Sequence, residues 1–181
     1  MKDAKPTWIE NRKLAVLVLV FAIIISIFGI GTAKVGSIGR KVQTQFSSVL
    51  SGERTARIAA AEGIVAASEA VAGDTAAYKE ADAAVQAIKA AKGAKAQYEA
   101  NVILNNKVET LYQNVHLING EPAMGSGLQM QYSEFSSRNN RLDRAKGDYN
   151  TVAFAAQKKL RGFPANMLAA LVGAKAEPFG A

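Results

Sequence analysis

Residues that could carry acid–base, nucleophilic or metal chemistry are few and scattered in this 181-residue sequence. It contains no cysteine, which excludes disulfides, thiolate metal ligands and cysteine nucleophiles. His116 is the only histidine, so one chain cannot build a metal site from several histidines, and we interpret it as a solvated or packed helical residue. No glycine-rich phosphate loop, HExxH motif, nucleophile elbow or calcium loop is present. The sequence therefore predicts no catalytic, cofactor-binding or metal site and no enzymatic activity.

Two sets of like-charged residues remain as candidates for chemistry. Three glutamates are spaced so that they could share a helical face, but without histidine or closer clustering they do not predict a di-metal carboxylate site. Three lysines lie close together on one predicted helix and could contact lipid headgroups or nucleic acid, yet no aromatic residues are interleaved with them. We therefore favour a solvated helical face. The residues concerned are Glu53, Glu62 and Glu69, and Lys89, Lys92 and Lys95.

The formal net charge is +7, from 22 Lys and Arg against 15 Asp and Glu. Such an excess fits an anionic lipid surface or another acidic partner. Along the sequence, however, basic residues are interspersed with acidic ones and form no dense cluster, so we predict no nucleic-acid binding. With 49% apolar residues the chain is long enough for one domain with a core.

An uncharged apolar run covers residues 14–33 and follows a short polar N-terminus, residues 1–13. Its twenty residues would span roughly 30 Å as a helix, the thickness of a bilayer's hydrocarbon core. The run predicts a transmembrane helix retained as an anchor. A cleaved signal peptide is the alternative, because Gly31-Thr32-Ala33 resembles a small-residue cleavage site.

The predicted anchor has charged or aromatic residues at both ends. Lys and Arg number four before the run and three after it, a near balance that leaves the orientation open. The predicted membrane-flanking residues are Trp8, Arg12, Lys13 and Lys34.

Residues 34–173 predict a helical bundle domain. A local break is expected at Ser51-Gly52, and Gly73 followed by Asp74 predicts a helix end and the N-cap of the next helix. Residues 74–118 predict one long helical region that Gly93 weakens, and a turn follows at residues 119–127. Residues 174–181 are expected to form an irregular tail.

A packing seam runs along residues 128–163, where apolar or aromatic residues recur every seven positions. Pro164 then stops or kinks the helix and can start a short one that Gly173 ends. The predicted fold is all-α, a single N-terminal transmembrane helix continuing into an antiparallel bundle of long helices. The seam residues are Leu128, Phe135, Leu142, Tyr149, Ala156 and Phe163.

The C-terminal part of the chain resembles the LemA family of bacterial membrane-anchored helical proteins. That family's signature runs approximately ENRI, ARRDYN, a second YN and then FP before a short apolar helix ending in glycine. The matching segments here are Asn139-Asn140-Arg141-Leu142, Ala145-Lys146-Gly147-Asp148-Tyr149-Asn150 and Phe163-Pro164, with Asn166 and Gly173 in their relative places. Upstream, Val42, Phe46, Ser47 and Val49 resemble the family's V-x-x-x-W-S-x-V segment.

Two features of the family pattern are missing. The second YN is replaced by Ala156-Gln157, and the family's arginine pair with its DLIPNLV stretch is not recognisable in residues 54–65. The resemblance implies that the matched residues define the fold rather than carry chemistry. They are Arg141, Asp148, Tyr149, Asn150, Phe163, Pro164, Asn166 and Gly173.

These observations predict a non-enzymatic, single-pass protein of the bacterial cell membrane. We expect its helical domain to form a homo-oligomer or to scaffold membrane and envelope organisation, with the lipid bilayer and envelope proteins as partners and no cofactor. The alternative is a single-pass signalling or sensor element that relays a displacement through a helical coil. An enzyme assembled across subunits, and charge-driven lipid or nucleic-acid binding, are less favoured hypotheses.

Overall fold

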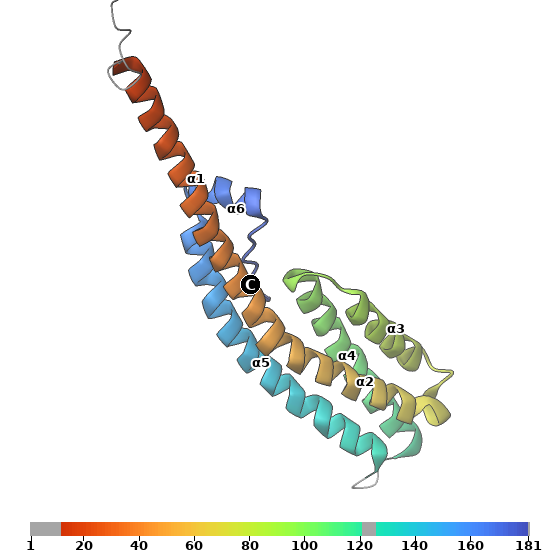
Figure 1. Ribbon diagram of the computed structural model, residues 1–181. Helices are drawn as coiled ribbons and strands as arrows, with labels where there is room; N and C mark the ends of the chain where they lie inside the picture. Colours follow the sequence, from red (N-terminus) through yellow and green to blue (C-terminus); the bar gives the residue numbers. More distant parts are fainter. Residues whose placement is uncertain (1–11, 121–125, 181) are drawn as a thin grey trace, which may run out of the picture. The chain divides into compact units, whose positions relative to one another are not determined.

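The computed structural model describes residues 12–120 and 126–180, and all regular structure in these residues is helical. The predicted all-α class is confirmed at this level. The elements in chain order are α1 (Arg12–Gln45), a π-helical turn η1 (Phe46–Leu50), α2 (Ser51–Ala72), α3 (Ala76–Ala90), α4 (Ala94–Asn119), α5 (Gly127–Leu160) and α6 (Ala165–Val172), as Figure 1 shows.

The chain divides into two compact units. The first unit comprises Met1–Lys41, described from Arg12 onward, together with Ala156–Lys175. The second unit comprises Val42–Ala155 and Ala176–Ala181, described to residue 180. Helices α1 and α5 contribute residues to both units. The predicted domain limits were placed at the ends of the predicted transmembrane helix, whereas these units are defined by contacts within the fold. The predicted limits stay a prediction.

The second unit is a helical bundle in which α2, α3 and α4 lie side by side, with short links reversing the chain between them (Figure 1). Alanines such as Ala61 and Ala81 are completely buried among larger side chains, which lets the helices approach closely while each buries little area. Phe135 of α5 belongs to the same core. The larger buried side chains from α2, α3 and α4 are Ile58, Ile64, Val65, Val85, Ile88, Leu104, Val108, Leu111 and Val115.

The links between these helices correct three sequence-based predictions. Thr75, not Asp74, caps α3, because its Oγ1 accepts the Tyr78 N–H at 3.2 Å. The region predicted as one long helix is two, α3 and α4. Ala91 adopts an extended conformation, and Gly93 has a φ of 82°, which only glycine adopts without strain. The helix therefore ends here and the chain turns, whereas the sequence predicted one helix that Gly93 weakens. The three lysines placed on one helix therefore lie in α3, the link and α4.

A π-helical turn replaces the break expected at Ser51-Gly52. The turn ends at Leu50, and α2 begins at Ser51 without interruption. Buried side chains recur at intervals of seven residues from Leu50 through Arg57 to Ile64, but Val42 precedes Leu50 by eight. The wider π turn absorbs the extra residue and keeps the same face of the helix buried.

Helix α5 confirms most of the predicted seam. Phe135, Leu142, Tyr149 and Ala156 are buried at seven-residue intervals. The helix ends at Leu160, however, so Phe163 lies beyond it and is 83% exposed. Its predicted place in the seam is wrong, because the seven-residue period applies only while the helix continues.

The first unit contains an apolar helical segment with no covering. Every described side chain from residue 12 to residue 30 is exposed. Among the described residues one helix is long and apolar enough to cross a membrane, and the most apolar window within it has no buried residue. Its length and apolar composition are those of a membrane anchor or of a signal sequence.

Candidate functional site

Tyr149 and Asn150 of α5 bind the last residues of the second unit, at the C-terminal end of the chain. The Tyr149 hydroxyl donates to the Glu177 carbonyl oxygen at 2.6 Å. The Asn150 amide makes two hydrogen bonds to one residue: its Nδ2 donates to the Phe179 carbonyl at 3.0 Å, and its Oδ1 accepts the Phe179 N–H at 2.7 Å. Burial and the nearby Glu177 carboxylate raise the pKa of Tyr149, so its hydroxyl stays a proton donor. We call residues 176–180 the C-terminal strap.

The strap is irregular in backbone, as predicted, but its side chains are not loose. Phe179 is 1% exposed and meets the Tyr98 ring edge to face, with ring centroids 5.4 Å apart. Lys146 lies over the same Tyr98 ring, with Nζ 4.4 Å from its centroid. On the other side of the motif, Phe46 packs edge to face on Tyr149. Tyr149 and Asn150 therefore hold the strap in place.

Arg57 forms a polar centre inside the second unit. Its side chain is 1% exposed, its guanidinium donates to the side-chain oxygens of Asn101 and Asn105, and its carbon Cζ lies 4.3 Å from the Phe135 ring centroid. Burial lowers the pKa of Arg57 to about 10, and the Asp143 carboxylate opposes that shift. The hydrogen-bond partners of the cation are neutral amides from α4, so this centre fixes how α2 packs on α4.

The other candidate residues do not gather in one place. Arg141 and Asp148 are exposed on α5. Asn166 accepts the Met167 N–H at 2.8 Å through its own Oδ1, at the start of α6. Pro164 occupies the N-cap of α6 rather than its first turn, and Gly173 ends the helix as predicted, in the left-handed conformation. The eight motif residues thus serve separate local tasks.

The glutamates and His116 show no catalytic arrangement. Glu53 pairs with Arg138 at 3.1 Å, and Glu62 pairs with Lys89 at 2.7 Å. His116 lies against the Tyr112 ring. Nowhere in residues 12–120 and 126–180 do three His, Asp or Glu side chains come together as metal ligands could.

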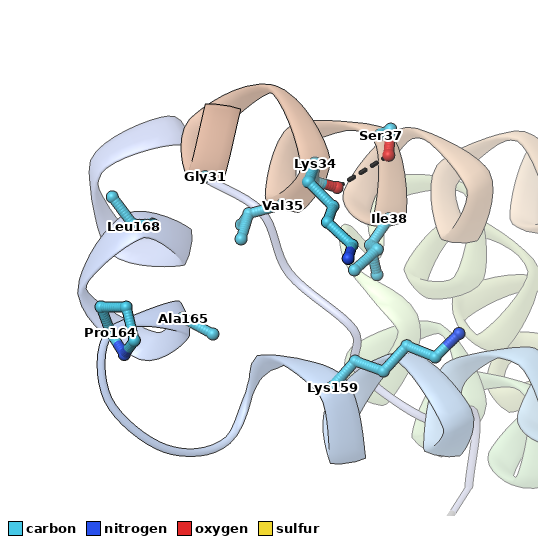
Figure 2. A pocket seen from close by; sticks show the side chains of 9 residues that line it. All are labelled: Gly31, Lys34, Val35, Ser37, Ile38, Lys159, Pro164, Ala165 and Leu168. Atoms are coloured by element: carbon cyan, nitrogen blue, oxygen red, sulfur yellow. Dashed lines mark hydrogen bonds between the residues drawn. The ribbon is translucent and has the colours of Figure 1, made fainter. Parts of the chain in front are cut away.

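The first unit holds a groove of about 700 Å³ between α1, the end of α5 and α6. Figure 2 shows Val35 and Ala165 pointing into it, while Lys34 and Lys159 extend from its two sides. Leu168 is buried against Val35 on its wall. A methyl group on Gly39 would stand 2.9 Å from the Ala174 side chain, so glycine permits this close approach of α1 to the chain after α6.

A second groove, of about 320 Å³, has only apolar walls. From α1 it takes side chains within the uncharged run, and from the other side it takes Phe163, Met167 and Leu168. The α1 residues are Ile24, Ile27 and Phe28.

The charged residues in the described part of the first unit are all basic. Its described segments, residues 12–41 and 156–175, contain nine basic residues and no Asp or Glu. All nine side chains are exposed. Basic residues are interspersed with acidic ones along the sequence as a whole but not in this described part, because folding gathers two distant segments that lack acids. The nine are Arg12, Lys13, Lys34, Arg40, Lys41, Lys158, Lys159, Arg161 and Lys175.

Three of the four predicted membrane-flanking residues can be located. Arg12 and Lys13 begin α1, and Lys34 lies on the groove wall. Trp8 falls outside the described residues.

Comparison with protein-family models, curated proteins and solved structures found no match to this chain. The resemblance to the LemA family therefore stays a prediction.

Sequence reasoning missed the strap and the arginine centre. A single aromatic residue, Phe179, in a short tail gives no periodic signal. Arg57 was missed because an arginine in an alanine-rich helix ordinarily reaches solvent. A usable signal was the pair Asn101 and Asn105, which lie one helical turn apart on the face that also carries Leu104 and Val108.

Proposed function

We infer that this chain is a non-enzymatic, single-pass bacterial membrane protein of the LemA type, held in the bilayer by α1, whose helical domain assembles with other copies or scaffolds envelope partners. The observation that carries this proposal is the wholly exposed apolar segment of α1. The sixteen exposed apolar side chains of residues 14–33, left in water, would strongly oppose solubility, whereas a bilayer solvates them.

The signal-sequence alternative is less favoured by the local packing. Helix α1 continues without interruption past residue 33 to Gln45. Gly31 lies against Leu168, since a methyl group added there would meet the Leu168 Cδ1 at 2.6 Å. Cleavage after Ala33 would remove that wall and leave Leu168 less covered.

Assembly is supported by apolar side chains that the second unit leaves exposed along α4. Leu117 and Ile118 near its end, and Val102 and Ile103 further back, are all exposed. Exposed apolar residues at these positions provide area for helix–helix contact with a second copy or another helical protein.

The membrane assignment is tested by fractionating cells that express the full chain. We expect the protein in the membrane pellet after an alkaline wash, with an intact mass near 19.1 kDa. A soluble product whose mass matches a chain that starts after residue 33 would refute the anchor and support a cleaved signal sequence.

The assembly assignment is tested by measuring the mass of the detergent-solubilised particle. We expect a particle larger than one chain plus micelle, and we expect Leu117→Lys with Ile118→Lys to reduce it. Ala66→Lys, at an exposed position of α2, is the matched control that should leave it unchanged. A monomer with no co-purifying protein would refute assembly while leaving the anchor standing.

A signalling element is the second candidate, and the π-helical turn is the observation that favours it. The turn lies in the helical stretch that leads from the apolar segment toward α2, and π turns are frequent at functional positions in helices. A kinase or response regulator recovered by crosslinking in cells would favour signalling over scaffolding. Recovery of only copies of this chain would count against it.

A further inference from the structure

Helix α6 carries almost no polarity. Residues 163–172 contain one polar side chain, Asn166, and no charge. One side of α6 is covered in the first unit, where Leu168 and Ala169 are buried in a cluster with Val35. Other apolar side chains of this segment are uncovered: Phe163, just before the helix, is 83% exposed, and Leu171 and Met167 within it are 68% and 55% exposed. Several large apolar side chains exposed on one short segment mark a surface that another apolar phase covers.

The position of this patch along α1 indicates what covers it. Phe163 and Met167 share a groove with Ile24 and Phe28. Those two α1 residues lie five to nine positions before residue 33, or roughly 8 to 14 Å inside the end of the apolar run at the standard helical rise. Wherever residues 14–33 are surrounded by hydrocarbon, the side chains packed beside them are at the same depth.

The backbone around α6 suits a site with little water. The Asn166 N–H donates to the Gly162 carbonyl at 2.9 Å, and the Leu168 N–H donates to the Pro164 carbonyl at 3.1 Å. The Asn166 side chain accepts the Met167 N–H, so a third amide at the start of the helix has a partner. Satisfied backbone groups are a condition for entering the apolar part of a bilayer.

Basic residues precede and follow α6 in the sequence. Lys158, Lys159 and Arg161 precede it and Lys175 follows it, all exposed, and no acid lies in either described segment of the unit. Lys159 and Lys34 flank the larger groove (Figure 2). Long basic side chains can reach phosphate groups while their stems stay in apolar surroundings.

We propose that α6 is an interfacial helix that lies in the same bilayer leaflet as the end of the α1 span. Met167 and Leu171 of α6, with Phe163 just before it, contact acyl chains, and the bordering cations bind anionic phospholipid headgroups. The proposal rests on α1 being a retained anchor. It adds a second, separate membrane contact more than a hundred residues further along the chain.

The test uses nitroxide labels on full-length protein in vesicles containing 30% phosphatidylglycerol in phosphatidylcholine. The chain has no cysteine, so single replacements label one position each. Met167→Cys reports on α6, Val18→Cys on the α1 span, and Ala66→Cys on an exposed position of α2. We expect the labels at 167 and 18 to be relaxed by oxygen far more than by a water-soluble nickel complex, and the label at 66 to show the reverse.

Each other pattern overturns a definite statement. A lipid-exposed label at 18 with a water-exposed label at 167 refutes the interfacial helix and leaves the anchor intact. Water exposure at both positions refutes the anchor itself. A label at 167 shielded from both reagents means that a protein surface, such as a second copy, covers α6, and this refutes the lipid assignment.

The anionic part of the proposal has its own variant. Lys158→Gln, Lys159→Gln and Arg161→Gln together should lower the ratio of inserted to released α6 roughly fivefold for each cation removed, in vesicles containing phosphatidylglycerol. In vesicles of phosphatidylcholine alone the variant and the unmodified protein should not differ. Equal insertion of both proteins in both vesicles would refute the role of anionic headgroups.

Discussion

Asn150→Ala should release the C-terminal strap without unfolding the bundle. The change removes two hydrogen bonds to Phe179, at 3.0 and 2.7 Å. Each neutral hydrogen bond contributes about 1 kcal/mol net, so the strap should lose about 2 kcal/mol, with a range of about 1 to 3. The Phe179 ring keeps its burial against Tyr98 only while the strap is closed.

Hydrogen–deuterium exchange of the C-terminal peptide in detergent measures this opening. A loss of about 2 kcal/mol corresponds to exchange roughly 30-fold faster in residues 176–180, while peptides from α2 and α3 keep their protection. Asn140→Ala is the matched control, since it changes the same residue type at an exposed position of the same helix. Asn150→Asp keeps the acceptor for the Phe179 N–H but sets a carboxylate oxygen against the Phe179 carbonyl, so it should open the strap at least as much.

Strap exchange within twofold of each other in Asn150→Ala and Asn140→Ala would show that Asn150 does not hold the strap. Equal loss of protection in α2 and α3 of Asn150→Ala would show that the strap and the bundle form one cooperative unit.

Three further predictions concern single positions in the second unit. The pKa of Tyr149 is raised in the folded state, so the stability that its hydroxyl gives the strap should be present below the ordinary tyrosine pKa of about 10 and lost as pH rises through the folded pKa. Tyr149→Phe keeps the ring and removes the hydroxyl, so it should cost about 1 kcal/mol at neutral pH and remove this alkaline dependence. Hydrogen–deuterium exchange of the strap across a pH series measures both effects. The pKa of Arg57 is lowered in the folded state, so burying its charged form costs free energy at neutral pH. In urea unfolding in mild detergent, Arg57→Ala should lower the free energy of unfolding by about 2 to 4 kcal/mol, because it leaves a cavity and unpaired amides. Arg57→Met fills the cavity and should lower it clearly less, and equal losses would contradict a dominant packing role. Gly93→Ala should destabilise by about 1 to 2 kcal/mol because φ is 82° there, while Gly147→Ala, in open space on α5, should stabilise by about 0.5 to 1 kcal/mol in the same unfolding measurement.

The sequence was informative where a local rule decides the structure. Leu142 and Tyr149 were predicted as buried because a seven-residue period on a helix marks one face, whatever packs against it. Gly173 was predicted as a helix end because glycine tolerates the left-handed conformation that closes the last turn. The uncharged run of residues 14–33 was recognised from its length and composition alone, and α1 contains it as one helix.

The candidate site could be predicted far less well, because long-range contacts decide it. The hydrogen bonds between Asn150 and Phe179 join residues 29 positions apart, and the Arg57 bonds join residues 44 and 48 positions apart. The all-basic charge in the described part of the first unit depends on two segments that are more than a hundred residues apart in the sequence. Gly93 was ambiguous for a different reason: a single glycine either weakens a helix or ends it, and the extended conformation of Ala91 settles which.

The π-helical turn at Phe46–Leu50 bears on how this chain should be aligned and edited. Eight residues separate Val42 from Leu50 where an ordinary helix would place seven, so the turn accommodates an insertion of one residue. A related sequence with an uninterrupted helix should therefore align with a single-position gap here. Deleting the exposed Ser48 should leave Val42 and Leu50 on the same buried face, while deleting one residue inside α2 should rotate every later core side chain by about 100° and unfold the bundle.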